Sequence, residues 1–195
     1  MSTPPGEYYT EERWNNWLDR LREEDIDPDN EDSARLLLNL QDDTAIAVAK
    51  IVTEHDEGEL DEEAALEELA GVRDIVLSEV EFDDEEKLML VDGVQTSLVC
   101  VFYAAEEYVA GGPAEDGTVE EFVRAAADAE AEEDLDSALA YCAKAGTLLF
   151  EGENLDMDVA QTIEYGLVAE WVNGLDSLGT ALADPEVIDE DENES

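Results

Sequence analysis

The sequence predicts an all-α fold, a single compact bundle of six or seven helices, on three observations. Apolar residues recur every three or four positions through most of the chain, which is the spacing of one helical face. No segment of useful length alternates apolar and polar residues with the period of two that a half-buried strand requires. Hydrophobic residues make up 44% of the 195 residues, enough for the core of one domain.

The first expected helix follows a flexible N-terminus at residues 1–9. Thr10 is a suitable N-cap, and Glu11 and Glu12 favour a helix start in the next turn. Pro28 cannot continue the helix and marks its end. The apolar residues of this helix fall at i, i+3, i+4 and i+7 and therefore share one face: Trp14, Trp17, Leu18 and Leu21.

Apolar periodicity places three more helices before a Gly-Gly-Pro stop at 111–113. The first of them, at about 33–54, has apolar side chains beyond one stripe, which favours a central position. A break inside it at Asp43 is also consistent with the sequence, because aspartate can cap a new helix. The next two helices are expected at 62–80 and at about 84–110.

Beyond the loop at 111–117, we expect a short helix, a helix at 135–150 and a last helix at 157–182. This loop is a candidate boundary between two subdomains of a helical domain at 10–184. The acidic residues 185–195 are expected to form a disordered tail. Several starts have suitable capping residues: Asp61, Asp83 with Glu86, and Thr118 with Glu121.

The charge of the chain predicts the solvent in which it works. It has 56 acidic and 9 basic residues and a formal net charge of −47, far above the magnitude of about 2–8 that suits a small domain. At about 1 M salt the Debye length is about 3 Å, so carboxylate repulsion is largely screened. We therefore expect a halophilic, potassium-rich cytoplasm. The alternative is an acidic mesophilic protein, but such proteins more often concentrate their acid in a tail.

The only histidine, His55, lies in the acidic stretch "TEHDEGELDEE" at 53–63, which we compared with a calcium loop. With Gly58 at the sixth position of an EF-hand, Thr53 and Ala64 occupy the first and last ligand positions, and neither suits calcium. We expect a plain turn, with His55 exposed in it. Because there is no second histidine, the usual zinc and di-iron motifs are absent. No catalytic, cofactor-binding or metal-binding residue is predicted.

Other motifs are equally uninformative about chemistry. Cys100 and Cys142 lie far apart in apolar context without a secretory signal, which favours reduced, buried thiols and a cytoplasmic location. The apolar stretch 88–105 contains Asp92 and several other polar residues, so a buried helix is expected there instead of a membrane span. Nine basic residues against 56 acidic ones argue against nucleic-acid binding.

The stripe of the first helix allows two interpretations. Trp14, Trp17, Leu18 and Leu21 either anchor this helix on its own bundle or form a face for a protein partner or a second copy, since tryptophan is common at interface hot spots. Trp17, nearer the middle of the stripe, is the stronger candidate for a bundle anchor.

Three stretches resemble one family of archaeal proteins, common in halophiles, that carries only a domain-of-unknown-function label: "YYTEERWNNWLDRL", "SARLLLNLQDDTAIAVAK" and "LVDGVQTSLVCVFYAAEEYV". The resemblance implies no activity, cofactor or catalytic residue. From the residues we expect a non-catalytic helical interaction or regulatory protein. The alternative is a small enzyme or metal-dependent protein with an unrecognised site.

Overall fold

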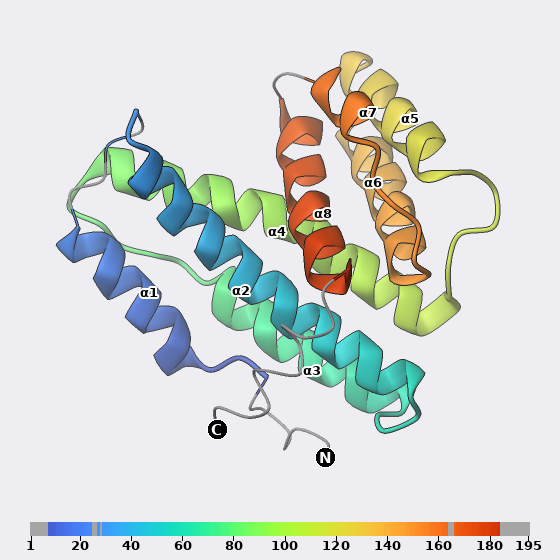
Figure 1. Ribbon diagram of the computed structural model, residues 1–195, viewed down its shortest axis with the longest axis horizontal. Helices are drawn as coiled ribbons and strands as arrows, with labels where there is room; N and C mark the ends of the chain where they lie inside the picture. The colour runs from blue at the N-terminus through green and yellow to red at the C-terminus, as the bar shows by residue number, and fades with distance from the viewer. Residues whose placement is uncertain (1–7, 25–26, 28, 164–165, 184–195) are drawn as a thin grey trace.

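Eight helices and no strand are found in the part of the chain that the computed structural model describes, residues 8–24, 27, 29–163 and 166–183 (Figure 1). The all-α prediction is confirmed. The helices are α1 (Glu11–Glu23), α2 (Glu31–Asp56), α3 (Glu62–Val76), α4 (Glu85–Gly111), α5 (Val119–Ala131), α6 (Leu135–Phe150), α7 (Met157–Gln161) and α8 (Leu167–Ala183).

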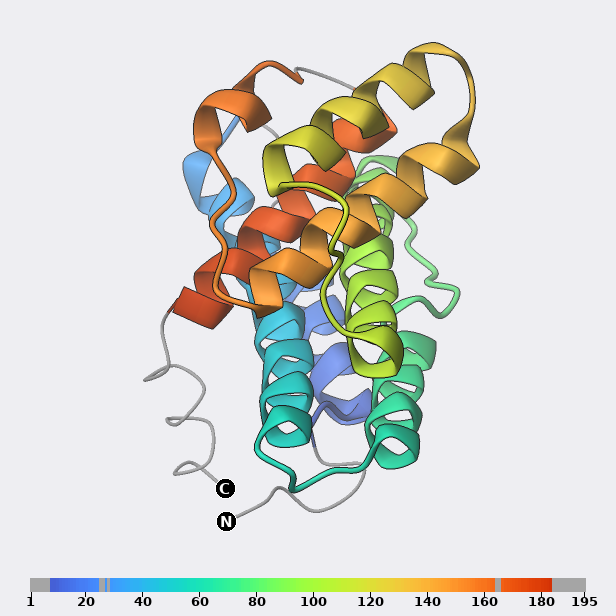
Figure 2. The same ribbon diagram turned by 90° about the vertical axis from the view of Figure 1, so that its right-hand side faces the viewer.

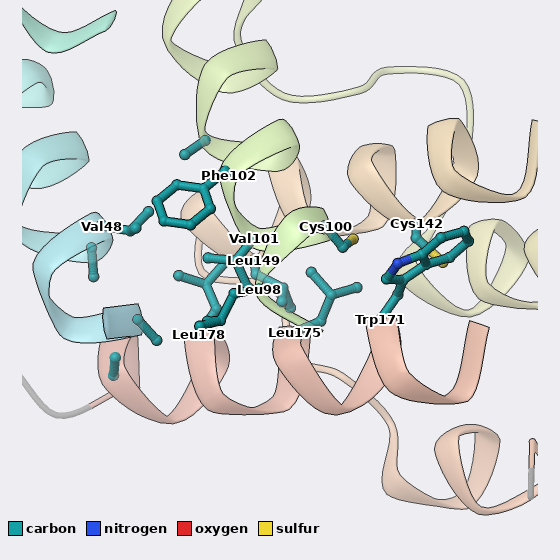
Figure 3. Packing of buried hydrophobic residues seen from close by; sticks show 14 of the residues in the cluster. Val48, Leu98, Cys100, Val101, Phe102, Cys142, Leu149, Trp171, Leu175 and Leu178 are labelled. Atoms are coloured by element: carbon teal, nitrogen blue, oxygen red, sulfur yellow. The ribbon is translucent and has the colours of Figure 1, made fainter. Parts of the chain in front are cut away.

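The two longest helices, α2 and α4, lie at the centre, and α8 packs on both of them (Figures 1 and 2). On one side α3 contacts α2 and α4, and α1 contacts α3. On the other side α6 packs on α4 and α8, while α5 covers α6. Figure 3 shows the part of the core between α2, α4, α6 and α8, with side chains that include Val48, Leu98, Phe102, Leu175 and Leu178.

The helix starts follow the capping residues closely. The side chain of Thr10 accepts a hydrogen bond from the Arg13 backbone nitrogen (3.1 Å). Asp61 caps α3 in the same way, and Thr118 and Glu121 form the expected capping box of α5. The predicted cap of α4 is wrong by one residue. Asp84, not Asp83, caps this helix, and its side chain accepts a hydrogen bond from the Glu86 backbone nitrogen (2.9 Å).

Helix α3, expected at 62–80, ends at Val76, and the structure also decides two other points about helix extent. The single helix expected at about 33–54 is confirmed as α2, which runs unbroken from Glu31 to Asp56, and the alternative break at Asp43 is absent because the Asp43 side chain bonds to α1. The last expected helix, 157–182, is two helices, α7 and α8. Gly166 stands at φ +109° just before α8, a left-handed conformation that interrupts a helix. This interruption adds the eighth helix.

The N-terminal boundary also differs from the expectation at two residues. Tyr8 and Tyr9, placed in the flexible segment 1–9, have buried rings, and the Tyr8 hydroxyl donates to the Glu54 carboxylate. The rest of that segment and the expected disordered tail at 185–195 lie outside the described residues. Helices on both sides of 111–117 pack on α4, and the subdomain boundary there stays a prediction.

Cys100 and Cys142 are buried free thiols on α4 and α6, as expected (Figure 3). Burial and the neighbouring Cys142 raise the pKa of the Cys100 thiol, so it stays protonated at neutral pH. Both thiols therefore serve the packing between α4 and α6.

Candidate functional site

The apolar stripe of α1, which was the candidate partner face, is buried against the chain's own helices. Trp14, Leu18 and Leu21 are buried, with Trp14 only 3% exposed. Trp17 is half-buried and packs against the same core. The order of the two tryptophans is thus opposite to the expectation, because the residue nearer the helix start is the deeper one. The α1 stripe anchors the helix to its own bundle and offers little apolar surface to a partner.

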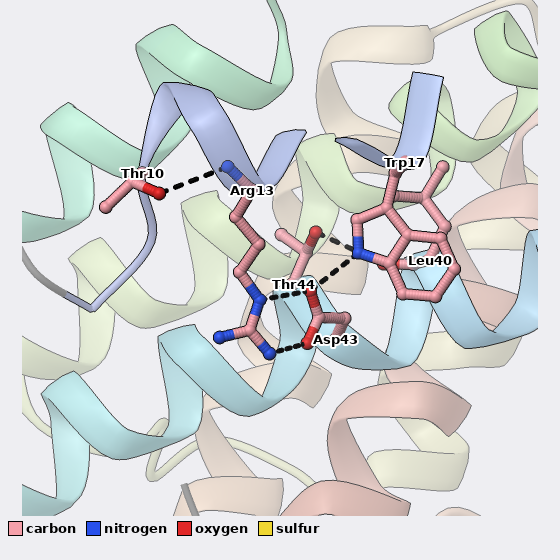
Figure 4. A network of polar contacts seen from close by, with 6 residues as sticks. All are labelled: Thr10, Arg13, Trp17, Leu40, Asp43 and Thr44. Carbon is pink, nitrogen blue, oxygen red and sulfur yellow. Dashed lines mark hydrogen bonds and ion pairs between the residues drawn. The ribbon is translucent and has the colours of Figure 1, made fainter. Parts of the chain in front are cut away.

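A polar network fixes the exposed side of α1 to α2 (Figure 4). Asp43 of α2 accepts from Arg13 Nε at 2.8 Å and from Trp17 Nε1 at 2.9 Å, and the Arg13 guanidinium forms an ion pair with it. One carboxylate therefore holds two α1 side chains that are one turn apart. This network explains the position of α1.

The acidic stretch 53–63 covers the last turn of α2, the connection between the two helices and the start of α3. Gly58 has φ +82°, which allows the sharp change of direction. The expectation for His55 was wrong: it is half-buried in the last turn of α2, with Nδ1 3.0 Å from the Leu60 carbonyl oxygen. This contact closes the turn. Within the described ranges, no group of three or more His, Cys, Asp or Glu side chains is arranged to hold a metal ion.

One cleft, of about 670 Å³, lies where the end of α1 meets the segment before α4. Its two cations are already used within the chain. Arg22 donates to the Glu81 carbonyl oxygen and lies over the Phe82 ring, and Lys87 donates to the Arg22 and Glu24 carbonyl oxygens. These contacts satisfy carbonyl groups at the C-terminal end of α1. The cleft is best explained as a structural junction.

A second cavity, of about 400 Å³, is a groove between α2, α4 and α8, and we call it the α2–α4–α8 groove. Nine of its ten lining residues are uncharged, and Glu170 is the exception. Its walls are formed by Ala34, Leu37, Leu38 and Gln41 of α2, by Leu90, Gly93, Val94 and Ser97 of α4, and by Glu170 and Asn173 of α8.

Exposed apolar side chains gather around this groove. Leu38, 46% exposed, lines it. Met89, 74% exposed, stands one turn before the lining residue Gly93, and the exposed Leu167 stands one turn before Glu170. These are three of the six exposed large hydrophobic side chains in the described chain.

A buried polar cluster closes one end of the groove and ties its three helices together. Gln41 Nε2 donates to Ser177 Oγ (2.8 Å) and to the Asn173 carbonyl oxygen (3.2 Å). The Ser97 hydroxyl donates to Gln41 Oε1 (2.8 Å). Gln41 and Ser97 line the cavity, but they and Ser177 hydrogen-bond to one another. They fix the groove's shape and leave its apolar wall as the part that can bind.

The groove has little means for acid–base chemistry. Glu170 is its only titratable lining residue, and burial together with the nearby charge of Asp92 raises the pKa of this carboxyl group. No nucleophile with an adjacent base lines the cavity. The arrangement can accept apolar side chains and offers one carboxylate at its rim.

The groove was not predicted from the sequence, although two short runs of apolar residues indicate exposed apolar side chains near it. Leu36–Leu37–Leu38 and Leu88–Met89–Leu90 each place three large apolar residues in succession on a helix. Three successive positions spread over about 200° of a helix, so one of them must leave the core-facing stripe. Leu38 and Met89 are the side chains that do so most fully.

Helix α4 is long and apolar enough to cross a membrane by length and composition alone, with a mean hydropathy of 1.6 over its most apolar window. Half of that window is buried, and α4 is packed by α2, α3, α6 and α8. A core helix of a soluble protein passes the same test, as expected for the stretch 88–105. No other helix in the described part of the chain passes it.

Comparison with curated proteins and with solved structures found no significant match. The model of one protein family matches residues 7–191, which is nearly the whole chain and includes α1, the groove and α8. That family is described as an uncharacterized protein conserved in archaea. The match confirms the resemblance seen in the sequence, and the chain belongs to the DUF2150 family.

Proposed function

We propose that this chain is a non-catalytic helical interaction protein of a high-salt cytoplasm, and that it binds another protein at the α2–α4–α8 groove. The observation that supports this most is the groove's lack of charge. One third of the chain is charged, so ten average residues would include about three charges, whereas the groove has one. Apolar surface that gathers in one place marks an interaction site.

The solvent proposed for this chain favours an apolar binding surface. Concentrated salt screens attraction between charged groups and strengthens apolar burial. A protein that must recognise a partner there gains more from a groove such as that between Leu38 and Val94 than from ion pairs. The occupant that fits is a folded protein surface presenting apolar side chains on helices. A nucleic acid does not fit, because the groove has no basic lining residue.

The alternative, a small enzyme or metal-dependent protein, has less support. An enzyme site usually brings several polar groups together in a pocket, often with perturbed pKa values. Here the buried polar groups Gln41, Ser97 and Ser177 bond to one another, and Glu170 is the one titratable residue among those that line the cavity.

Photo-crosslinking in cells tests this proposal. A photoreactive amino acid is placed at Met89, beside the groove, or at Tyr103, an equally apolar position of α4 that is 47% exposed and outside it. In an archaeal host grown at high salt, we expect a discrete protein adduct from position 89 and none from position 103. Adding Gly93→Leu, which fills the groove, should abolish the adduct. Equal adducts from both positions, or an adduct that Gly93→Leu leaves unchanged, would contradict the proposal.

A further inference from the structure

We propose that Cys100 of α4 and Cys142 of α6 form a reversible disulfide bond when a small disulfide oxidises the chain, and that the fold positions them for this modification. The inference is independent of the proposed function. Three observations carry it. The two cysteines are the only ones in the chain, they lie in one contact between two helices, and the backbones of these helices approach closely there.

The close approach is seen where α6 crosses α4 (Figure 2). A β-carbon added at Gly146 of α6 would lie 2.4 Å from the β-carbon and 3.8 Å from the α-carbon of Ala104 of α4. Since a carbon–carbon bond adds about 1.5 Å, the α-carbons of Ala104 and Gly146 are at most about 5.3 Å apart, within the range of about 4.4–6.8 Å for disulfide-linked residues. Cys100 and Cys142 each stand one turn before this pair, on the same two helix faces.

The two thiols are neighbours inside this contact. Cys100 and Cys142 are fully buried, and both lie in the core shown in Figure 3. Burial and then the Cys142 thiol raise the pKa of the Cys100 thiol, and the second cause requires the two side chains to be close. A disulfide needs its sulfur atoms about 2.05 Å apart, and rotation about χ1 moves a cysteine sulfur without moving the backbone. The bond can therefore form while α6 stays packed on α4.

The reaction is a thiol–disulfide exchange. One protein thiol loses its proton, and its sulfur attacks the small disulfide, which gives a mixed disulfide and releases one small thiol. The second protein sulfur then loses its proton, attacks the protein sulfur of the mixed disulfide and releases the other small thiol. The protein thiols thus give up two protons and two electrons, and the small disulfide takes up both.

Burial controls when this exchange occurs. A protonated, buried thiol is a poor nucleophile, so the small disulfide reaches it when α6 parts from α4. In a reducing cytoplasm the thiols stay free and pack the core. Under oxidation, a chain that loosens acquires the bond, and the bond then holds α6 on α4.

Equilibrium with reduced and oxidised glutathione tests the inference, because it measures the effective concentration of one thiol at the other. The full chain is equilibrated in about 2 M KCl, either with enough urea to unfold it or after refolding from urea, so that burial does not prevent exchange. Mass spectrometry measures the oxidised fraction. We expect the effective concentration to be at least about tenfold higher in the folded chain, because a disulfide that fits the native geometry stabilises the fold by at least this factor.

Peptide mapping identifies the bond. Trypsin cleaves after the basic residues Lys87, Arg124 and Lys144. The expected bond therefore joins peptide 88–124 to peptide 125–144 of one chain. Helical circular dichroism shows that the oxidised chain is folded.

The matched control moves one thiol along α6. Cys142→Ala combined with Ala138→Cys keeps two buried thiols but shifts one of them by a turn, about 6 Å along the helix axis. Its effective concentration in the folded state should be at least about tenfold below that of wild type. The inference is overturned if the folded wild-type chain gains less than about tenfold over the unfolded chain, if the bond forms only between chains, or if the shifted pair equals wild type.

Discussion

Gly174 of α8 lies against Ser97 of α4, so close that a β-carbon at position 174 would come within 2.1 Å of the Ser97 carbonyl oxygen. A backbone oxygen cannot turn aside as a flexible side chain can. The absence of a side chain at Gly174 therefore allows α8 to approach α4. The same approach lets Ser177 reach Gln41 and Asn173 close the end of the groove.

We therefore expect Gly174→Ala to lower the free energy of unfolding by about 3 kcal/mol, the upper part of the range for an overpacked core. Gly179→Ala on the same helix is the matched control. A β-carbon there meets nothing within 4 Å, and alanine favours a helix over glycine by about 1 kcal/mol, so the control should be slightly more stable. Urea unfolding in about 2 M KCl measures both. Equal stability of the two variants would contradict this packing.

Asp43 offers a second test of stability. Its carboxylate accepts hydrogen bonds from Arg13 and Trp17 and is largely buried. Asp43→Ala removes the acceptor that Arg13 and Trp17 share and should cost about 1.5–3 kcal/mol, the usual range for hydrogen bonds to charged groups. Asp43→Asn keeps one acceptor oxygen and should cost less.

The control for Asp43 is Asp19→Ala, which breaks an exposed pair with Arg22 (3.0 Å) and should change the free energy of unfolding by under about 1 kcal/mol. Urea unfolding in about 2 M KCl again compares the variants. If Asp43→Ala and Asp19→Ala cost the same, the network in Figure 4 does not hold α1.

Local chemistry made most of the fold predictable. Thr10 and Thr118 cap helices because their hydroxyl groups accept from backbone nitrogens two or three residues away, and such contacts depend on short sequence spacing alone. Short sequence spacing is a poor guide where distant residues decide. Asp43 has the right chemistry for a helix cap, yet it bonds to Arg13, 30 positions earlier in the chain.

The groove could not be predicted for the same reason. Ala34, Gly93 and Asn173 become neighbours only when α8 crosses α2 and α4, and that crossing depends on the contact between Gly174 and Ser97. The tryptophan stripe of α1 was a stronger sequence signal for a partner face. Trp14 is nonetheless buried, because an apolar stripe on a helix has the same pattern whether its own bundle or a partner covers it.

Tyr108 should make the fold sensitive to alkali. Its hydroxyl is within hydrogen-bonding distance of Glu151 Oε1 (2.8 Å) and Asp56 Oδ2 (3.0 Å), and burial with these two carboxylates raises its pKa well above the ordinary value of about 10. Below pH about 10 the hydroxyl is protonated in both the folded and the unfolded chain. Above that pH the unfolded chain releases the proton first, so the stability of the fold falls as pH rises.

Thermal midpoints between pH about 8 and about 11, in about 2 M KCl, measure this effect. Wild type should lose stability above pH about 10, and Tyr108→Phe should lose less over the same range. Some loss will remain, because burial also raises the pKa values of Tyr8 and Tyr9. Tyr103→Phe, at an exposed position, is the control and should follow wild type. A Tyr108→Phe curve parallel to wild type would argue against the two carboxylates as the cause.

The last prediction concerns salt. At about 0.1 M KCl the Debye length is about 10 Å, so carboxylates on neighbouring helices still repel one another; at about 2 M the repulsion is largely screened and apolar burial remains. The thermal midpoint should therefore rise steeply between these concentrations. A variant with Gln at four exposed acidic positions separates repulsion from other effects of salt: Glu23, Glu67, Glu132 and Glu153. Among the described residues, none of the four makes a side-chain hydrogen bond or ion pair. This variant should melt above wild type at about 0.1 M KCl, and the difference should vanish at about 2 M. If the wild-type midpoint stays level over this range, the charge of −47 does not tune the fold to concentrated salt, and the high-salt cytoplasm must be abandoned.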